Sequence, residues 1–139
     1  DNRKSVSLPP HCQGARILLV EDNEINQQVA REVLEKAGCY VTVAADGRLG
    51  VDAVQERPTY YDGVLMDIQM PVLDGYGATR EIKNDPRFQG LPIIAMTANA
   101  MMGDRERCID AGMNGYVSKP IQVNDLFAEI NRVLGDMNP

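Results

Sequence analysis

Four places in the chain put a polar, chemically capable side chain just after an apolar run. The pair Glu21-Asp22 follows ILLV, Asp67 follows GVLM, Thr97 follows PIIAM, and Lys119 comes shortly after GYV. If these groups share a site, three carboxylates would repel one another, so their pKa values rise or a cation enters. An oxygen-only site of carboxylates and backbone carbonyls suits Mg²⁺. The residue types therefore predict a magnesium site.

The remaining groups extend this prediction to phosphorus chemistry. The Lys119 ammonium is a compact point charge suited to a phosphoryl oxygen, and the Thr97 hydroxyl can donate to another such oxygen. A carboxylate beside Mg²⁺, a lysine and a hydroxyl are the parts needed for nucleophilic attack on phosphorus, which gives an aspartyl-phosphate. In the stretch VLMDIQMPVLDG, Pro71 and Gly75 turn the chain away after Asp67 and leave this carboxylate accessible.

The elements that position these residues can be read from hydrophobic periodicity. Five short apolar runs are candidate strands, at 17–20, 40–44, 63–66, 92–96 and 115–117. Segments with helical spacing fill the gaps, at 25–37, 49–54, 75–82, 98–111 and 123–134. Strands that are nearly unbroken apolar runs, each followed by a helix, predict a parallel (βα)₅ sheet covered on both faces.

Several details of these helices are also predicted. The first has an apolar stripe and the stop signal Gly38; the stripe comprises Ile25, Val29, Val33, Ala30, Leu34 and Ala37. The last has one apolar face, formed by Leu126, Phe127, Ile130, Val133 and Leu134. Asp74 is expected to be the N-cap of the third helix. The segment 98–111 has few large apolar residues and is expected to be the most loosely held helix.

A strand order of 2-1-3-4-5 would bring all of these polar residues together. Ligands of open α/β sheets bind beyond the carboxyl ends of the strands, where the strand order reverses. Strands one, three, four and five would then deliver their terminal groups to one pocket. The second strand, which ends in the plain turn Ala45-Asp46-Gly47, would lie at the edge.

Length and composition bound the remaining possibilities. The 139 residues suffice for one domain, and 44% hydrophobic with 24% charged residues are typical of a soluble globular protein. A net charge of −6 argues against nucleic acid as a partner, and no apolar run is long enough to span a membrane. The three cysteines, Cys12, Cys39 and Cys108, lack a metal-binding spacing and are expected to be reduced thiols. Residues 1–14 are expected to be a linker or tail, 15–136 the domain, and 137–139 a second tail.

Taken in order, these motifs resemble the receiver domain of two-component response regulators over residues 14–135. The matching residues are Glu21-Asp22 in LLVEDNEINQ, Asp67 in VLMDIQMPVLDG, Thr97 in AMTANAM, and Lys119-Pro120 in YVSKP. The resemblance implies a flavodoxin-like (βα)₅ fold of α/β class.

The resemblance also implies roles for single residues. Asp67 would be the phosphoacceptor, while Glu21, Asp22, Asp67 and the Gln69 backbone carbonyl would hold Mg²⁺ or Mn²⁺. Lys119 and Thr97 would bind the phosphoryl oxygens. Thr97 and Tyr116 would form a switch, and Lys119-Pro120 would be a cis peptide.

The sequences of these motifs are similar to those of receiver domains within hybrid sensor histidine kinases. The implied partners are a phosphohistidine-bearing kinase domain and a histidine phosphotransfer domain. The only histidine, His11, lies in the tail, so the phosphoryl group must arrive from another domain or from a small acyl or amido phosphate. The domain would be cytoplasmic, with no membrane contact of its own, in a parent protein that the inner membrane could anchor. It would catalyse its own phosphorylation and dephosphorylation without being a free-standing enzyme.

Other functions are disfavoured by particular residues. A stand-alone or transcription-factor receiver is the nearest alternative. An aspartyl-phosphate phosphatase usually has an acid two residues after its nucleophile, where this chain has Gln69. A flavin-binding module needs a phosphate-cradling loop, whereas EDNEIN is acidic and lacks glycine. A phosphorylation-independent binding module would not need every functional position filled. Singly, Asp67 could be a turn cap, Glu21-Asp22 first-turn acids, and Lys119 a surface lysine.

Overall fold

The computed structural model describes residues 13–98 and 103–135. Apart from Gln13 and Gly14, the expected tails at 1–14 and 137–139 therefore lie outside the described residues, as do His11 and Cys12.

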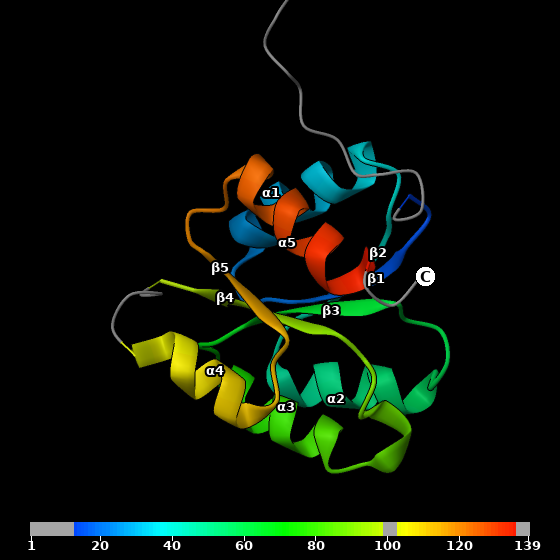
Figure 1. Ribbon diagram of the computed structural model, residues 1–139, viewed down its shortest axis with the longest axis vertical. Coiled ribbons are helices and arrows are strands. Elements are labelled where there is room, and N and C mark those ends of the chain that lie inside the picture. The colour runs from blue at the N-terminus through cyan, green and yellow to red at the C-terminus, as the bar shows by residue number, and fades with distance from the viewer. Residues whose placement is uncertain (1–12, 99–102, 136–139) are drawn as a thin grey trace, which may run out of the picture.

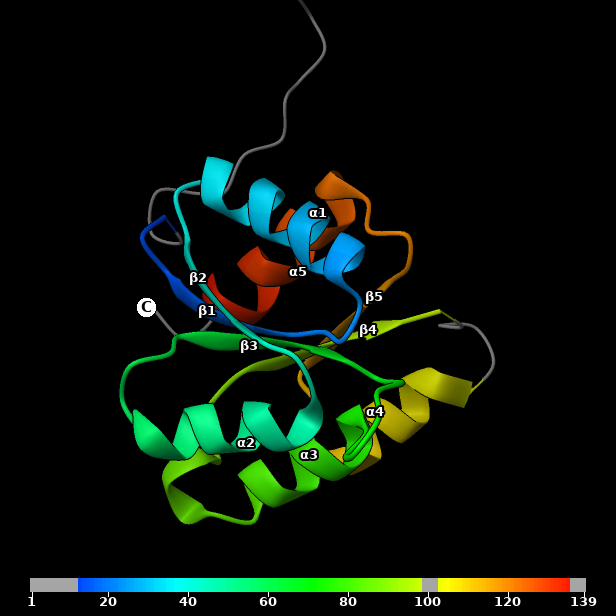
Figure 2. The same cartoon turned by 180° about the vertical axis from the view of Figure 1, so that it is seen from behind.

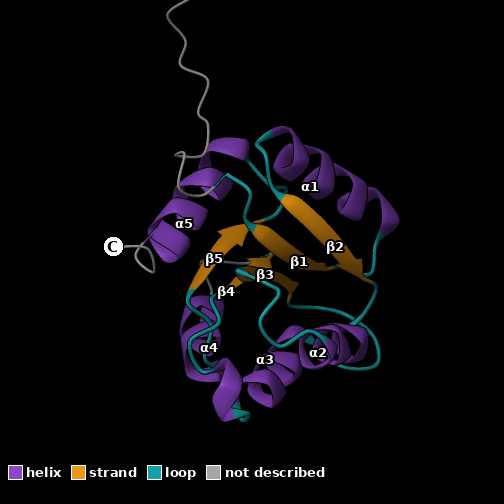
Figure 3. Ribbon diagram, turned by 90° about the vertical axis from the view of Figure 1, so that its right-hand side faces the viewer, coloured by secondary structure: helices purple, strands orange, loops and turns teal. Residues whose placement is uncertain are grey.

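Five parallel strands form one sheet in the order β2-β1-β3-β4-β5, which confirms the predicted topology. The strands are β1 (Arg16–Val20), β2 (Tyr40–Ala44), β3 (Gly63–Asp67), β4 (Ile93–Thr97) and β5 (Gly115–Ser118). Asp67 is paired in register with Met96, and Thr97 with Ser118, so three strands end at nearly the same level. Figure 3 shows the sheet between two layers of helices.

The helices cover both faces of this sheet (Figures 1 and 2). One face carries α1 (Glu24–Lys36) and α5 (Val123–Gly135). The other carries α2 (Gly47–Glu56), α3 (Gly75–Lys83) and α4 (Arg105–Ala111), and a short 3₁₀ helix spans Pro86–Phe88. Each face has its own core: Leu19, Leu34 and Ile130 belong to the first, while Leu18, Ile82 and Phe88 belong to the second.

Side-chain caps explain where three helices begin. The Asn23 side chain accepts a hydrogen bond from the Asn26 N–H, and Asp46 accepts one from the Leu49 N–H. Asp74 accepts a hydrogen bond from the Gly77 N–H at 2.8 Å, so its predicted N-cap role is confirmed. Asp46 is more than the plain turn residue that was expected, because its carboxylate satisfies a free N–H of α2.

Hydrophobic periodicity predicts α5 better than α1. All five apolar positions predicted for α5 are buried. In α1, Ala30 and Leu34 are buried, but Ile25 and Val29 are 72% and 47% exposed. The expected six-residue stripe is therefore only partly a core stripe, and the first turns of α1 present apolar side chains to the surface.

The helix expected at 98–111 is shorter in the structure. Ala98 lies in a bend, residues 99–102, including Met101 and Met102, lie outside the described residues, and α4 begins at Arg105. Gly103, at φ +88°, and Asp104 form a π-helical turn that leads into α4. The regular helix is therefore limited to seven residues.

Two further expectations concern the cysteines and the membrane. Cys39 and Cys108 are both buried, and Cys108 is a free thiol as expected. Within the described ranges, no helix is long and apolar enough to cross a membrane.

Candidate functional site

The carboxyl ends of β1, β3, β4 and β5 surround a crevice of about 530 Å³. In Figure 1 this edge of the sheet lies on the left, where β4 ends. The residues that line the crevice include Glu21, Asp22, Asp67, Gln69, Thr97 and Lys119. All the residues predicted to contact metal or phosphoryl oxygens therefore meet in one place, because the strand order makes their strands neighbours.

An ion-pair network forms the floor of the crevice. Lys119 Nζ lies 2.9 Å from Asp67 Oδ1 and 3.1 Å from Glu21 Oε1. Glu21 and Asp67 are 1% and 3% exposed. Burial raises the pKa of Glu21, and the neighbouring charge of Asp67 adds to that rise. Burial lowers the pKa of Lys119, but its contacts with Asp67 and Glu21 outweigh burial and leave that pKa raised, so the lysine stays cationic.

The acidic cluster fits a divalent cation. Glu21, Asp22 and Asp67 can each offer a carboxylate oxygen, and these three oxygens lie within 4.8 Å of one another. Glu21 Oε1 is buried without a hydrogen bond, and its contact is the ion pair with Lys119. A buried carboxylate oxygen whose contact among the described residues is this ion pair, within an oxygen-only donor set, is chemically suited to a hard cation such as Mg²⁺.

A close backbone approach presents Asp67 to this crevice. The Gly75 N–H donates to the Ile68 carbonyl oxygen at 2.8 Å, so the start of α3 is pressed against the end of β3. A Cβ at Gly75 would lie 2.3 Å from the Asp67 backbone oxygen, which explains why glycine is needed there. The intervening loop contains Val72, which has φ +71° and is 79% exposed.

Lys119 is delivered by the end of β5. Its N–H donates to the Thr97 carbonyl oxygen at 2.8 Å, so the two residues are held side by side. The Lys119-Pro120 peptide is cis, as the resemblance implied. Gln69 is exposed at the mouth of the crevice, and its backbone carbonyl as a metal ligand stays a prediction.

One crevice residue was missed by the sequence analysis. The Thr97 hydroxyl donates to Asp104 Oδ2 at 2.6 Å, and the Tyr76 hydroxyl donates to Asp104 Oδ1 at 3.4 Å. Burial, followed by the neighbouring groups of Cys108 and Asp104, raises the pKa of Tyr76 to about 12, so this hydroxyl keeps its proton. Asp104 escaped notice because it lies inside a segment that periodicity assigned wholly to a helix.

Tyr116, the second predicted switch residue, lines a different cavity, between α4, β5 and α5. Its ring lies 5.8 Å from the Arg105 guanidinium, and its N–H donates to Glu129 Oε2 at 2.9 Å. Burial raises the pKa of Glu129, but hydrogen bonds from Arg132 and from this N–H outweigh it, so the pKa lies below the ordinary value. Arg132 also donates to the Asn114 carbonyl oxygen, tying α5 to β5.

Comparison with known proteins identifies the family of this chain. The model of the response regulator receiver domain matches residues 17–131. The chain belongs to the response regulator receiver domain family.

Three relatives illustrate the breadth of the receiver family. Over 121 residues the chain is 41% identical to "Hybrid signal transduction histidine kinase I" of Dictyostelium discoideum, matching 84% of this chain but spanning only 7% of that protein's length. The crystal structure of the receiver domain of sensor histidine kinase PA1611 from Pseudomonas aeruginosa is 48% identical, with a TM-score of 0.80, and covers 88% of this chain and 98% of that one. That structure has a magnesium ion coordinated in the active site cleft.

The third relative is a receiver domain seen in a complex. The receiver domain of Ssk1 from Saccharomyces cerevisiae, crystallised with the histidine phosphotransfer protein Ypd1, is 26% identical with a TM-score of 0.83. The match covers 91% of this chain and 93% of that one. The fold and family of this receiver domain therefore agree with the expectation from its sequence.

Proposed function

We propose that this receiver domain accepts a phosphoryl group on Asp67 from a phosphohistidine. The observation that carries the proposal is the position of the Asp67 carboxylate: at the end of β3, 2.9 Å from Lys119 Nζ, beside two further carboxylates. A nucleophile, a fixed cation and an acidic cluster in one crevice are the parts that phosphoryl transfer requires.

In the proposed reaction an Asp67 carboxylate oxygen attacks phosphorus in line with the scissile bond. An O–P bond forms, the P–N bond to the imidazole breaks, and its electron pair stays on the departing nitrogen. Lys119 pairs with a phosphoryl oxygen in place of the carboxylate oxygen that it contacts in this structure, and Thr97 donates its hydroxyl proton to another. Attack by water on the acyl phosphate would later return Asp67 to its free form.

Glu21, Asp22, Asp67 and the Gln69 backbone carbonyl would hold Mg²⁺ or Mn²⁺ in this reaction. The bound ion would supply positive charge that offsets the negative charge of the phosphoryl oxygens. The magnesium in the PA1611 receiver supports this choice. Glu21 contributes a buried oxygen without a hydrogen bond, and Asp22 contributes an exposed carboxylate at the mouth.

The proposed partner is a histidine phosphotransfer domain, which would exchange the phosphoryl group with Asp67. Its docking surface would include the exposed Ile25 and Val29, one helical turn apart on α1. Asn23 and Asn26 at the start of the same helix line the crevice, so a partner on α1 would reach Asp67. The complex of the Ssk1 receiver with Ypd1 supports this type of partner.

By the same proposal the parent protein is a hybrid sensor histidine kinase, and the Dictyostelium relative, a hybrid signal transduction histidine kinase, supports this. The kinase domain would supply the phosphohistidine on the cytoplasmic side. Anchoring of the parent in the inner membrane belongs to this proposal as well.

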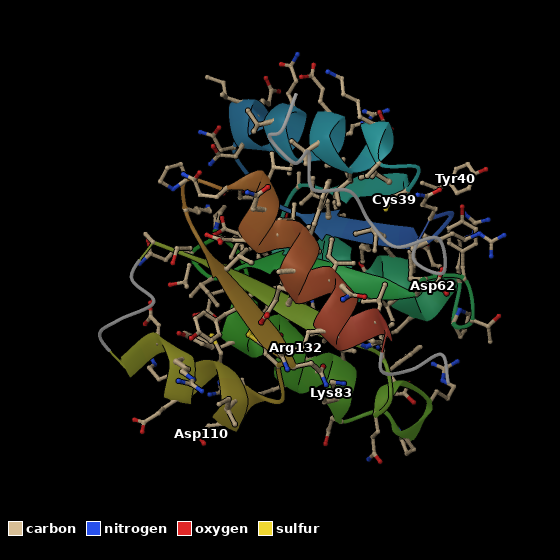
Figure 4. All side chains as sticks on the ribbon, turned by 45° about the horizontal axis from the view of Figure 1, so that its top comes forward. Cys39, Tyr40, Asp62, Lys83, Asp110 and Arg132 are labelled. Atoms are coloured by element: carbon tan, nitrogen blue, oxygen red, sulfur yellow. The ribbon has the colours of Figure 1, made fainter. Side chains whose placement is uncertain are left out.

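The test of the phosphoacceptor is intact mass after incubation with acetyl phosphate or phosphoramidate, with and without Mg²⁺. Wild type should gain one phosphoryl group only with Mg²⁺, and Asp67→Asn should gain none. Asp62→Asn is the matched control, because Asp62 is an exposed aspartate where β3 begins, at the end of the molecule away from the crevice (Figure 4). Equal labelling of Asp67→Asn, or no labelling of wild type by either donor, would contradict the proposal.

The docking surface is tested separately by transfer from a phosphorylated histidine phosphotransfer domain. Ile25→Ser should slow this transfer and leave labelling by acetyl phosphate unchanged. Tyr40→Ser is the control, since Tyr40 is 64% exposed on β2 at the opposite end of the strands (Figure 4). Equal slowing by both variants would count against the α1 surface.

A further inference from the structure

Asp104 stands at the N-cap position of α4 but does not cap it. Its side chain makes no capping hydrogen bond, and its backbone has φ −61° and ψ −34°, which is helical. The capping residues Asn23, Asp46 and Asp74 have extended backbones, and their side chains accept from N–H groups of their helices. The Asp104 carboxylate is therefore engaged elsewhere.

The Asp104 carboxylate faces the phosphoacceptor crevice. It accepts the Thr97 hydroxyl from β4 at 2.6 Å and the Tyr76 hydroxyl from α3 at 3.4 Å. The Tyr76 ring is 4% exposed, and the Arg107 guanidinium lies 4.5 Å from its centre. Three elements thus converge on one carboxylate in the crevice that Asp67 and Lys119 also line.

We propose that Asp104 is a positioning residue that holds the Thr97 hydroxyl in the unphosphorylated domain and competes with the phosphoryl group on Asp67 for that hydroxyl. This inference rests on the proposed function, because it concerns the same phosphoryl group. Asp104 would thereby lower the affinity of the crevice for a phosphoryl group and help set the balance between the two states of the domain.

The competition follows from the chemistry of a hydroxyl. Thr97 Oγ1 carries one proton, so a hydrogen bond donated to Asp104 and one donated to a phosphoryl oxygen exclude each other. The bond to Asp104 is short and has a charged acceptor, which places it among the stronger hydrogen bonds of proteins. Any phosphoryl group that recruits Thr97 must first break this bond.

Release of Thr97 also has a consequence for α4. The freed carboxylate would already be at the N-cap position, where it can accept from an N–H group in the first turn once its backbone becomes extended. Phosphorylation of Asp67 would thus change the start of α4 through one side chain, that of Asp104.

The test uses beryllium fluoride with saturating Mg²⁺, a stable mimic of the phosphoryl group, with binding followed by ¹⁹F NMR. Asp104→Ala should strengthen binding about tenfold, the low end of what a hydrogen bond to a charged acceptor contributes. Asp104→Asn, which keeps an uncharged acceptor, should fall between this variant and wild type. In the free Asp104→Ala domain, the Thr97 methyl resonance should move toward its position in the bound wild type.

Two controls separate this competition from simpler effects. Glu106→Ala removes an exposed carboxylate from the first turn of the same helix and should change affinity by about twofold at most, because exposed charges are screened. In a Thr97→Val background the hydroxyl is absent, so Asp104→Ala should then have almost no effect.

The measured affinities distinguish a failure of this inference from a failure of the proposed function. Equal strengthening in both backgrounds would assign the effect to charge alone and overturn the inference, as would no strengthening in wild type. If Asp67→Asn abolishes binding of beryllium fluoride but Asp104→Ala leaves the affinity unchanged, this inference fails and the proposed function stands. If wild type does not bind the mimic, or Asp67→Asn binds it equally well, both fail.

Discussion

Lys119→Met is the change whose consequences the structure defines best. Lys119 Nζ is the cation that contacts both Asp67 and Glu21, at 2.9 and 3.1 Å, and these carboxylates are nearly fully buried. Methionine keeps the apolar stem and removes the charge. The variant therefore leaves two buried carboxylates facing each other without compensation.

The magnitude follows from the burial. Removing one partner of a buried ion pair costs about 3–5 kcal/mol. The Lys119 side chain is 24% exposed, so water can enter the vacated space. We therefore expect the free energy of unfolding to fall by about 2–3 kcal/mol without metal.

Mg²⁺ should reverse much of this loss. A ligand at one hundred times its dissociation constant adds about 2.7 kcal/mol of stability. The variant should gain more from Mg²⁺ than wild type does, because the acidic cluster no longer contains a competing cation. At high Mg²⁺ the two proteins should differ by less than about half of the difference seen in EDTA.

The assay is urea unfolding followed by circular dichroism, in EDTA and in excess Mg²⁺. Lys83→Met is the matched control, because Lys83 Nζ is partly buried and donates to the carbonyl oxygens of Gln89 and Leu91, and within residues 13–98 and 103–135 it forms no ion pair with a carboxylate. Its loss of stability should not depend on Mg²⁺. A Lys119→Met domain as stable as wild type in EDTA, or a deficit that Mg²⁺ leaves unchanged, would refute the reasoning.

Three further predictions concern other parts of the domain. Gly75→Ala forces a Cβ against the β3 backbone and should lower the free energy of unfolding by about 3 kcal/mol, whereas Gly90→Ala, in open space, should change it by less than about 0.5 kcal/mol in the same urea titration. The pKa of Glu129 is lowered in the folded state, so its contribution to the free energy of unfolding is present above the ordinary pKa of 4.5 and is lost as pH falls through the folded-state pKa. Glu129→Gln should therefore lower the free energy of unfolding by about 1 kcal/mol at pH 7 and by less in acid. Urea denaturation across a pH series would measure this. Asp22→Ala, at an exposed position, should change stability in EDTA by no more than about 0.5 kcal/mol yet abolish the rise in melting temperature produced by Mg²⁺; a variant still stabilised by Mg²⁺ would exclude Asp22 as a ligand.

Much of this receiver domain could be predicted from its sequence because the information is local. Apolar runs of strand length alternate with helical spacing, so the parallel sheet followed from general rules of α/β folds, while its order was a hypothesis that brings the polar residues together. Once that order is assumed, the residues that end neighbouring strands must meet, and Glu21, Asp67, Thr97 and Lys119 do so. The prediction worked where a residue's role depends on its position along a strand.

The tertiary structure decided what depends on contacts between distant segments. Periodicity alone could not tell that Ile25 and Val29 face outward, because whether an apolar face is covered depends on what packs against it. Likewise, Asp104 had the sequence features of an ordinary acidic residue in a polar helix. Only the convergence of α3, β4 and the start of α4 brings its carboxylate within 2.6 Å of the Thr97 hydroxyl. A hydrogen bond needs atoms within about 3 Å and a suitable angle, and packing of the whole chain sets both.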